Sequence, residues 1–428
     1  MPGRVCIDGF NLSLEKGSGI ATYARNLHDG LAGLGFETQL LLGPARAPGG
    51  NNLLNEIALS DGVPLKPTRK SVARFLSNRT SKPVREAVAV TRTGEVIAPR
   101  TDLIDRAKVV WSCHDVFHTA NWDYGAHGRF TDLRLGPVTE PAQTDVTHWT
   151  CALPIREVRS ANLYTIHDVV PLRLPHATLD DKGRYFAMCA EICRKADHVV
   201  TVSEQSKADI IRLFGIDEAR ITNTYQAVDV SQALAGANDE ETAAEVESAL
   251  GLPWRGYFLY FGAVEPKKNI GRLAEAYLTS GVKAPLIVVG GRAWLEDGET
   301  GLVESSLADG RIRRYDYLPR QLLLSLVRGA RTTLFPSIYE GFGLPVLESM
   351  ALGTPVLTSN AGALAEVAGD AALLVDALDV RGIKRGIQAL DADEAMRADL
   401  AARGLGQAEK FSAQAYQGRL AELYKRFV

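Results

Sequence analysis

The sequence has no long uninterrupted run of apolar residues, and none reaches the roughly eighteen that a membrane-spanning helix needs. It is also poor in net charge, because 48 Lys and Arg stand against 51 Asp and Glu. A formal charge of −3 therefore gives no reason to expect nucleic acid as a partner. The opening residues MPGRVCIDGF begin a strand-like pattern and lack the apolar core of a signal peptide, which predicts a cytoplasmic protein.

Cysteine is scarce as well, with five in 428 residues. An odd, small number in a long chain predicts reduced thiols rather than a disulfide framework. Cys189 and Cys193 would lie one helical turn apart, but no second Cys or His pair follows them at zinc spacing. We therefore interpret both as helix packing and predict no metal site.

The residues that are present describe a soluble globular α/β protein. Hydrophobic residues make up 46% of the chain and charged residues 23%, and the length suggests two or three domains. Strand-like and helix-like segments alternate along most of the sequence. Strands are expected at Arg4–Asp8, Phe36–Leu42, Leu163–Ile166, His198–Val202, Arg220–Thr224, Gly256–Val264, Leu286–Val289, Ile312–Tyr315, Thr332–Phe335 and Pro355–Thr358.

The most informative segment runs from residue 333 to 360, TLFPSIYEGFGLPVLESMALGTPVLTSN. It is predicted to be a strand, a charged glycine turn, a helix over Leu344–Leu352 that Gly353 ends, and a second strand. In a parallel sheet such a turn lies where the next helix offers free N–H groups to an anion. Glu340 and Glu348 bracket this turn with seven residues between them, and carboxylates suit paired sugar hydroxyls. The alternative is that Glu340 caps the helix and Glu348 is solvated.

This segment resembles the donor-binding signature of the retaining, nucleotide-sugar-dependent glycosyltransferases of family four, whose mark is Glu, seven residues, Glu. The resemblance implies a GT-B fold, in which two Rossmann-like, doubly wound domains face a central cleft. It implies a nucleotide-sugar donor and no cofactor. It also implies donor contacts from Glu340, Gly341, Phe342, Gly343, Leu344 and Glu348.

Domain boundaries follow from the change to Ala, Gly and Glu between residues 230 and 250. We predict an acceptor-binding domain over residues 1–235 and a donor-binding domain over residues 250–410. The tail is helical in pattern, and in the fold that the chain resembles a last helix crosses back, here residues 411–428.

Lys267 and Lys268 are expected in the loop between the strand YFLYFGAV and the next helix, which begins near Asn269. Two ammonium groups beside a helix N-terminus suit a diphosphate, and a solvated lysine pair is the alternative. Lys268 matches the lysine of the family, but Ala263 stands where the family usually has arginine. Relatives with a similar EP-basic-KN loop point to mannosyl transfer.

Two places in the first half also carry site candidates. Gly17 and Gly19 would lie at the N-terminus of a helix from Ile20 to about Leu34, where a phosphate or substrate can approach, and the alternative is a simple turn. His167 follows a strand at its ligand side, and the resemblance places it against the donor sugar near the anomeric carbon. Its neighbour Asp168 should face the opposite way, so two separate roles are expected rather than a dyad.

A basic segment spans Lys66 to Lys108, with eleven Lys or Arg and four Asp or Glu. This local balance of +7 fits anionic lipid head groups or a phosphorylated acceptor. A solvated basic insertion is the equally weighted alternative.

Two shorter segments, DVFHTANWDYG from Asp115 and DVTHWTCALP from Asp145, each place a His and a Trp near the end of a β-like run. Aromatic faces beside polar groups are typical of sugar sites, although a lone Trp is more often core. Asp391-Ala392-Asp393 spells the pattern of metal-dependent glycosyltransferases, but its place at a helix start predicts capping.

The resemblance, with the residues that match it, implies retaining, metal-independent transfer of a hexose to a glycan or lipid-linked acceptor in cell-surface polysaccharide synthesis, with GDP-mannose as the expected donor. His167, Glu340 and Lys268 are the expected catalytic residues. A sugar-nucleotide epimerase of the same fold is one alternative, since it would act without an acceptor. A binding scaffold without turnover is the other, motivated by Ala263.

Overall fold

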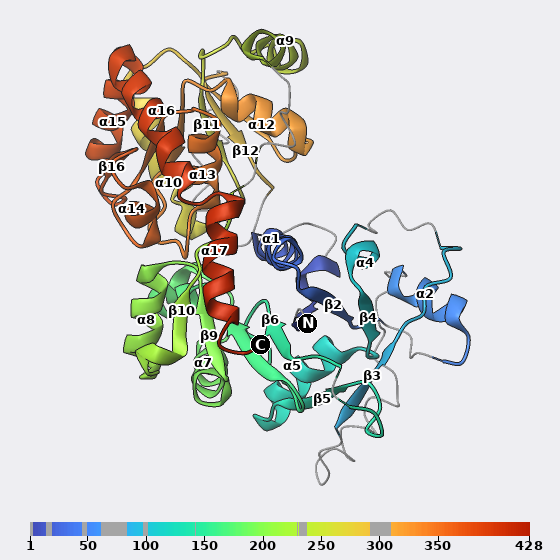
Figure 1. Ribbon diagram of the computed structural model, residues 1–428. Coiled ribbons are helices and arrows are strands. Elements are labelled where there is room, and N and C mark those ends of the chain that lie inside the picture. The colour runs from blue at the N-terminus through green and yellow to red at the C-terminus, as the bar shows by residue number, and fades with distance from the viewer. Residues whose placement is uncertain are drawn as a thin grey trace.

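The computed structural model describes residues 3–13, 19–44, 49–60, 84–96, 102–141, 143–228, 230, 238–291 and 310–428. Within these residues the strands form two separate sheets, one of ten strands and one of six (Figure 1). Gly17 and a large part of the basic segment lie outside the described residues, so their predictions stay untested.

The ten-stranded sheet has the order β10-β9-β8-β6-β1-β2-β4-β3-β5-β7. Its pairings are parallel except for β3 with β4. The carboxyl ends of β1, β6 and β8 therefore lie side by side at one edge. The strands are β1 Arg4–Asp8, β2 Glu37–Leu42, β3 Arg85–Ala89, β4 Val109–Ser112, β5 Thr131–Leu135, β6 Val146–Trp149, β7 Ile155–Glu157, β8 Ala161–Thr165, β9 His198–Thr201 and β10 Ile221–Asn223.

The six-stranded sheet has the order β13-β12-β11-β14-β15-β16 and is parallel throughout. Its central strands are short apolar or β-branched runs that are buried at every residue, as expected for a sheet with both faces covered. They are β11 Phe258–Phe261, β12 Leu286–Val289, β13 Ile312–Tyr315, β14 Thr332–Phe335, β15 Val356–Ser359 and β16 Leu373–Val375.

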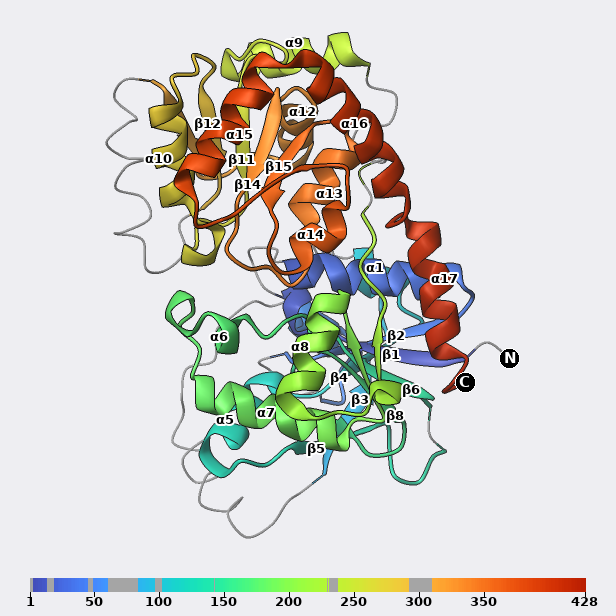
Figure 2. The ribbon, with the colours of Figure 1, turned by 90° about the vertical axis from the view of Figure 1, so that its left-hand side faces the viewer.

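Helices alternate with these strands and cover the sheets (Figures 1 and 2). In the described stretches, no helix combines the length and apolar character that crossing a bilayer demands. They are α1 Gly19–Gly33, α2 Asn52–Ser60, α4 Asp102–Arg106, α5 Val116–His127, α6 Val170–Arg173, α7 Lys182–Lys195, α8 Glu204–Phe214, α9 Asp239–Leu250, α10 Ile270–Ser280, α12 Arg320–Arg328, α13 Leu344–Ala351, α14 Ala363–Ala368, α15 Val380–Ala392, α16 Glu394–Glu409 and α17 Ala413–Tyr424.

The last helix, α17, leaves the six-stranded unit and packs beside α1 of the ten-stranded unit (Figure 2). Tyr416 and Leu420 lie against Gly30 of α1. The Tyr424 hydroxyl contacts His148 Nδ1 at 2.6 Å. Buried residues of both units and of α17 therefore form one continuous hydrophobic cluster.

Most of the predicted strands are present, but one local prediction is wrong. The segment after Asp115 is helix α5 rather than a β-like run, so it is no structural counterpart of β6. Trp122 is 43% exposed on that helix, whereas Trp149 is fully buried in β6. Cys189 and Cys193 pack in the core from α7, as predicted.

Candidate active site

The predicted signature forms a tight loop between β14 and α13. Gly343 caps α13 with φ 122°, a conformation that residues with a Cβ rarely adopt. A Cβ there would also lie 2.7 Å from Leu364 Cδ2. Pro345 occupies the first turn of α13, where the lack of an N–H costs no hydrogen bond. Gly343 and Pro345 therefore restrict the backbone at the start of α13, with Glu340 before the helix and Glu348 one turn inside it.

Glu340 is buried between two lysines. Lys268 Nζ lies 2.5 Å from Glu340 Oε1, and Lys267 Nζ lies 3.9 Å from Oε2. Burial alone would raise the pKa of Glu340, but the charges of Lys268 and Lys267 hold that pKa below its ordinary value. The site thus contains an ionised carboxylate and two ammonium groups within one charge network.

The two loops that carry these groups are bonded to each other. Ile338 N donates to Lys267 O at 2.8 Å. The amide of Asn269, fully buried with φ 65°, donates to Pro336 O at 2.8 Å and to Ala377 O at 2.7 Å. Because β11 and β14 are neighbouring parallel strands, these bonds fix the lysine loop against the signature loop.

Glu348 has a different partner from Glu340. Its Oε1 lies 2.5 Å from Arg320 Nη2, and its side chain is 13% exposed. Arg320 begins α12 and is 52% exposed. The sequence did not predict this pair, since no motif links the two helices.

On the facing sheet, His167 follows β8 and is held by two contacts. Its Nε2 donates to Thr150 O at 2.8 Å, and the ring of Tyr23 packs edge-on with centroids 4.8 Å apart. Burial lowers the pKa of His167 despite the opposing effect of the Thr150 bond. The ring is therefore neutral at pH 7 with its proton on Nε2, which makes Nδ1 a hydrogen-bond acceptor. Tyr23 lies one helical turn after Gly19, so the start of α1 borders this site.

Asp168 has partners of its own, as expected. Its Oδ1 accepts from the N–H of Val170, the first residue of α6, at 2.9 Å. Asp168 also meets the signature loop, because a Cβ at Gly341 would lie 2.7 Å from both Cβ and Oδ2 of Asp168. Burial opposes protonation of Lys267, but Glu340, Asp168 and Glu265 raise its pKa above the ordinary value. Asp168, which follows the ten-stranded sheet's β8, therefore lies close to Glu340 and Lys267 of the six-stranded unit.

Further contacts between the units involve α8, and sequence reasoning missed them. Ser203 Oγ donates to Gly341 O at 2.8 Å while also accepting from Ser206 N at 3.0 Å. Glu366 on α14 accepts from the N-terminal N–H groups of α8, at 2.8 and 3.1 Å. The Tyr339 hydroxyl donates to the buried carboxylate of Asp209. The sequence showed Ser203 only as a helix start.

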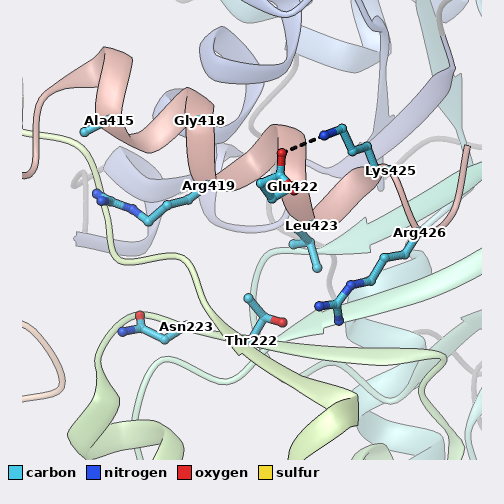
Figure 3. A pocket seen from close by; sticks show the side chains of 9 residues that line it. All are labelled: Thr222, Asn223, Ala415, Gly418, Arg419, Glu422, Leu423, Lys425 and Arg426. Carbon is cyan, nitrogen blue, oxygen red and sulfur yellow. Dashed lines mark hydrogen bonds and ion pairs between the residues drawn. The ribbon is translucent and has the colours of Figure 1, made fainter.

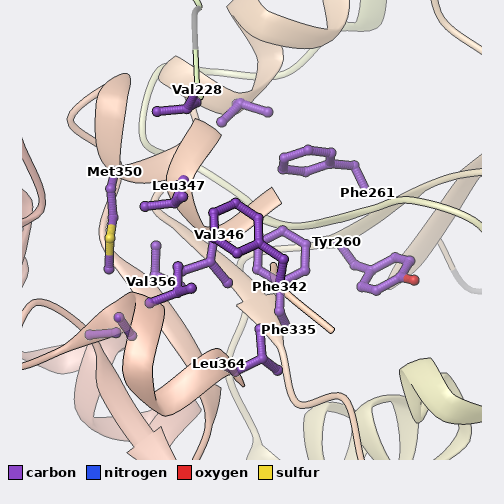
Figure 4. Close-up of a cluster of buried hydrophobic side chains, with 14 of the residues drawn as sticks. Val228, Tyr260, Phe261, Phe335, Phe342, Val346, Leu347, Met350, Val356 and Leu364 are labelled. Carbon is purple, nitrogen blue, oxygen red and sulfur yellow. The ribbon is translucent and has the colours of Figure 1, made fainter. Parts of the chain in front are cut away.

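Two other predicted donor-binding residues, Phe342 and Leu344, pack in or against the hydrophobic core. Phe342 is buried in a hydrophobic cluster near Val346, Leu347 and Leu364 (Figure 4). Leu344 is partly buried against the same core. Any donor contact from Phe342 must therefore come from its main chain. Ala263 follows β11, and its carbonyl accepts from the Tyr260 hydroxyl at 2.9 Å.

The aspartates of the Asp391-Ala392-Asp393 pattern have structural partners. Asp393 caps α16 by accepting from Met396 N at 2.8 Å, which confirms the capping prediction. Asp391 forms an ion pair with Arg331. These carboxylates are thus engaged in helix and loop structure.

A pocket of about 600 Å³ lies elsewhere, between β10 and α17 (Figure 3). Arg419, Lys425 and Arg426 line it, but Arg419 donates to Thr224 O at 2.9 Å and Lys425 pairs with Glu422 at 2.7 Å. It contains none of the residues that the sequence assigned to a site.

The fold is shared with solved glycosyltransferase structures. Sucrose-phosphate synthase from Thermosynechococcus elongatus superposes with a TM-score of 0.67 at 17% identity, covering 99% of this chain and 98% of that one. HepE from Anabaena, solved with UDP-glucose, gives 0.64 at 14% identity and covers 99% of each chain. The two facing α/β units therefore form a GT-B fold.

Sequence comparison identifies the family. Residues 252–406 match the model described as glycosyl transferases group 1, and residues 142–232 match glycosyltransferase family 4. O-antigen chain mannosyltransferase B of Escherichia coli is 38% identical over 265 residues, which is 61% of this chain and 68% of that protein. The serotype-specific mannosyltransferase WbdA of Escherichia coli is 30% identical over 62% of this chain, a match that spans 33% of WbdA. The chain is a member of glycosyltransferase family 4.

Proposed function

We propose that the protein transfers mannose, with retention of configuration, from GDP-mannose to a hydroxyl of a growing glycan in cell-surface polysaccharide synthesis. The observation that carries this proposal is the cluster of Glu340, Lys267 and Lys268 at the ligand edge of one sheet, in contact with the Asp168 region of the other. Such a cluster offers cations for a diphosphate and a carboxylate for sugar hydroxyls.

Each of these residues contacts a different part of the donor. Glu340 holds sugar hydroxyls, Glu348 holds the ribose, and Lys267 with Lys268 neutralises the diphosphate as it departs. His167 lies beside the sugar and offers Nδ1 as an acceptor, since Nε2 is bonded to Thr150. The bond between the sugar and the diphosphate breaks as the acceptor oxygen bonds to the sugar, and the departing phosphate accepts the proton of the acceptor hydroxyl. The lysine charges stabilise the departing diphosphate, so that turnover proceeds without a metal ion.

Mannose is the favoured sugar for two reasons. The loop Glu265 to Asn269, EPKKN, resembles that of mannosyl-transferring relatives. The similar proteins from Escherichia coli are also named as mannosyltransferases of O-antigen or serotype-specific chains.

A panel of GDP- and UDP-sugars tests the proposal through nucleotide release, with and without a mannose-terminated glycan, in the presence of a chelator. Release from GDP-mannose that requires the glycan is the expected result. Conversion of the donor without an acceptor would instead identify an epimerase. Binding of the donor without turnover of any acceptor would identify a scaffold, and strict dependence on Mn²⁺ would contradict the mechanism.

Glu348→Ala is expected to raise the donor dissociation constant about tenfold and to leave kcat within a factor of about two. A ribose contact has similar strength in the ground and transition states, so its loss acts on binding. Calorimetric titration and initial rates measure the two effects separately. Glu275→Ala, an exposed change on α10, is the matched control. A large loss of kcat with unchanged affinity would remove Glu348 from this role.

We also propose that the protein acts at the inner face of a membrane on a lipid-linked acceptor. The basic balance of residues 66–108 motivates this, and helix α2 adds an exposed apolar face of Leu53, Leu54 and Ile57. An apolar helix face beside basic residues suits an anionic lipid surface. Among the described basic residues, Arg92 and Arg106 instead pair with Asp105 and Asp29.

Sedimentation with anionic vesicles should therefore show binding at low salt that weakens at high salt, because screening reduces electrostatic attraction. Ile57→Glu should reduce the bound fraction several-fold. Leu378→Glu, at an exposed leucine of the other unit, should not. Absence of binding at low salt would dismiss membrane contact.

A further inference from the structure

Asp8 is a buried carboxylate that the proposed mechanism does not use. It ends β1, at the same sheet edge as His167, and its relative exposure is 1%. Its Oδ1 accepts from Phe10 N at 3.2 Å, and its Oδ2 accepts from Thr150 N. Burial raises the pKa of Asp8 to about 6, although these hydrogen bonds oppose the rise. Burial of a carboxylate costs desolvation free energy, which its hydrogen bonds offset, and a group with such a perturbed pKa is a candidate for a functional role.

What Asp8 holds is the segment that contacts His167. Thr150 directly follows β6, which lies between β1 and β8 in the sheet. Its N–H is bonded to Asp8, and its carbonyl accepts from His167 Nε2 at 2.8 Å. The next residue is held from the same side, because Asn11 Nδ2 donates to Cys151 Sγ at 3.3 Å. The loop after β1 thus fixes the loop after β6.

The connection between Asp8 and His167 is positional. The N–H and the carbonyl of Thr150 belong to different peptide units, so charge on Asp8 does not polarise the carbonyl directly. Asp8 instead fixes the direction of that carbonyl, and the carbonyl keeps the imidazole proton on Nε2. If Thr150 turned away, the neutral ring would lose this preference, and Nδ1 would be an acceptor only part of the time.

We propose that Asp8 is a positioning residue, which fixes the tautomer and orientation of His167 through the backbone of Thr150. The consequence for turnover rests on the proposed function of His167 beside the sugar. The effect of Asp8 on the tautomer of His167 does not depend on that function, since the tautomer can be observed without substrate.

Asp8→Asn tests this proposal with little change of volume. One of the two N–H groups would face an amide nitrogen instead of an oxygen, so one of the two bonds is lost. In histidine-labelled protein, ¹⁵N shifts of His167, assigned with His167→Gln, should show a proton on Nε2 in the wild type and mixed tautomers in Asp8→Asn. We expect kcat to fall about tenfold with the KM for the donor unchanged.

Asp145→Asn is the matched control, because Asp145 holds Arg4 at the opposite end of the same strand pair. It should leave the His167 shifts and kcat unaltered. Unchanged shifts in Asp8→Ala, which loses both hydrogen bonds, or equal effects in Asp8→Ala and Asp145→Asn, would overturn the proposal. A wild-type ring protonated on Nδ1 at pH 7 would overturn it even if Asp8→Asn fails to fold. If no donor is turned over, the proposed function fails while the shifts still decide the role of Asp8.

Discussion

Lys268→Ala is expected to lower kcat by a factor on the order of a hundred or more, while donor affinity changes much less. The charge on the diphosphate grows as the sugar departs, so a cation beside it stabilises the transition state more than the ground state. Lys268 Nζ already lies 2.5 Å from Glu340, which places its charge beside the proposed sugar site. Lys267, at 3.9 Å, cannot replace both its charge and its position.

Single-turnover and steady-state rates with a saturating donor measure this effect. Lys283→Ala, which removes an exposed lysine of the same unit, should keep wild-type kcat. A Lys268→Ala enzyme with kcat within about threefold of wild type would assign the diphosphate to other groups. Circular dichroism must show an intact fold, since the variant leaves Glu340 buried with one lysine fewer.

Gly341→Ala is expected to lower kcat/KM at least tenfold by separating the two units at the active site. The added Cβ would lie 2.7 Å from Asp168 Cβ as well as from its Oδ2, so a turn of the carboxylate alone would not make room. Overpacking of this kind costs about 1–3 kcal/mol, which is comparable to the loss of several hydrogen bonds. Gly341 O would also move away from Ser203 Oγ, which donates to it.

Kinetics and small-angle scattering report on this change together, because a shifted signature loop should weaken activity and widen the angle between the units. Gly406→Ala serves as the control, since a Cβ at this exposed position of α16 meets no atom within 4 Å. If Gly341→Ala retained wild-type kcat/KM, the contact with Asp168 would have no part in assembling the site.

Local patterns predicted much of the fold because the second sheet is buried on both faces. Leu286–Val289 and Thr332–Phe335 have the predicted bounds, since each is a short, fully buried apolar or β-branched run that ends at glycine or proline. Ile312–Tyr315 also has the predicted bounds, although it is an edge strand that contains two arginines. The signature loop was also predicted, because its two glutamates, glycine turn and helix are neighbours in the sequence.

Helix α5 shows where local patterns failed. Its apolar residues do not keep to one face, so DVFHTANWDYG has no helical period to detect. Asp115, in the left-handed conformation, precedes it without a side-chain cap. Strands β3, β5 and β7 were also not predicted, because they are short, and β3 buries only its central residue.

Contacts between residues that are distant in the sequence could not be predicted from local patterns. Ser203 and Gly341 are 138 positions apart, and Thr150 and Asp8 are 142 apart. Each pair joins a side chain to a main-chain group, which any residue can supply. The signature motif therefore predicted the loop that carries Glu340 and the helix that carries Glu348, while the contacts that hold them in place required the structure.

Glu340→Gln tests most directly the proposal that Glu340 acts on the sugar during transfer. Nucleotide release from GDP-mannose with a glycan acceptor, measured alongside the donor dissociation constant, separates turnover from binding. The variant keeps the shape of the side chain but weakens a charge-assisted hydrogen bond to a sugar that is becoming cationic. We expect kcat to fall more than donor affinity, whereas an intact kcat with weakened donor binding would contradict this role of Glu340.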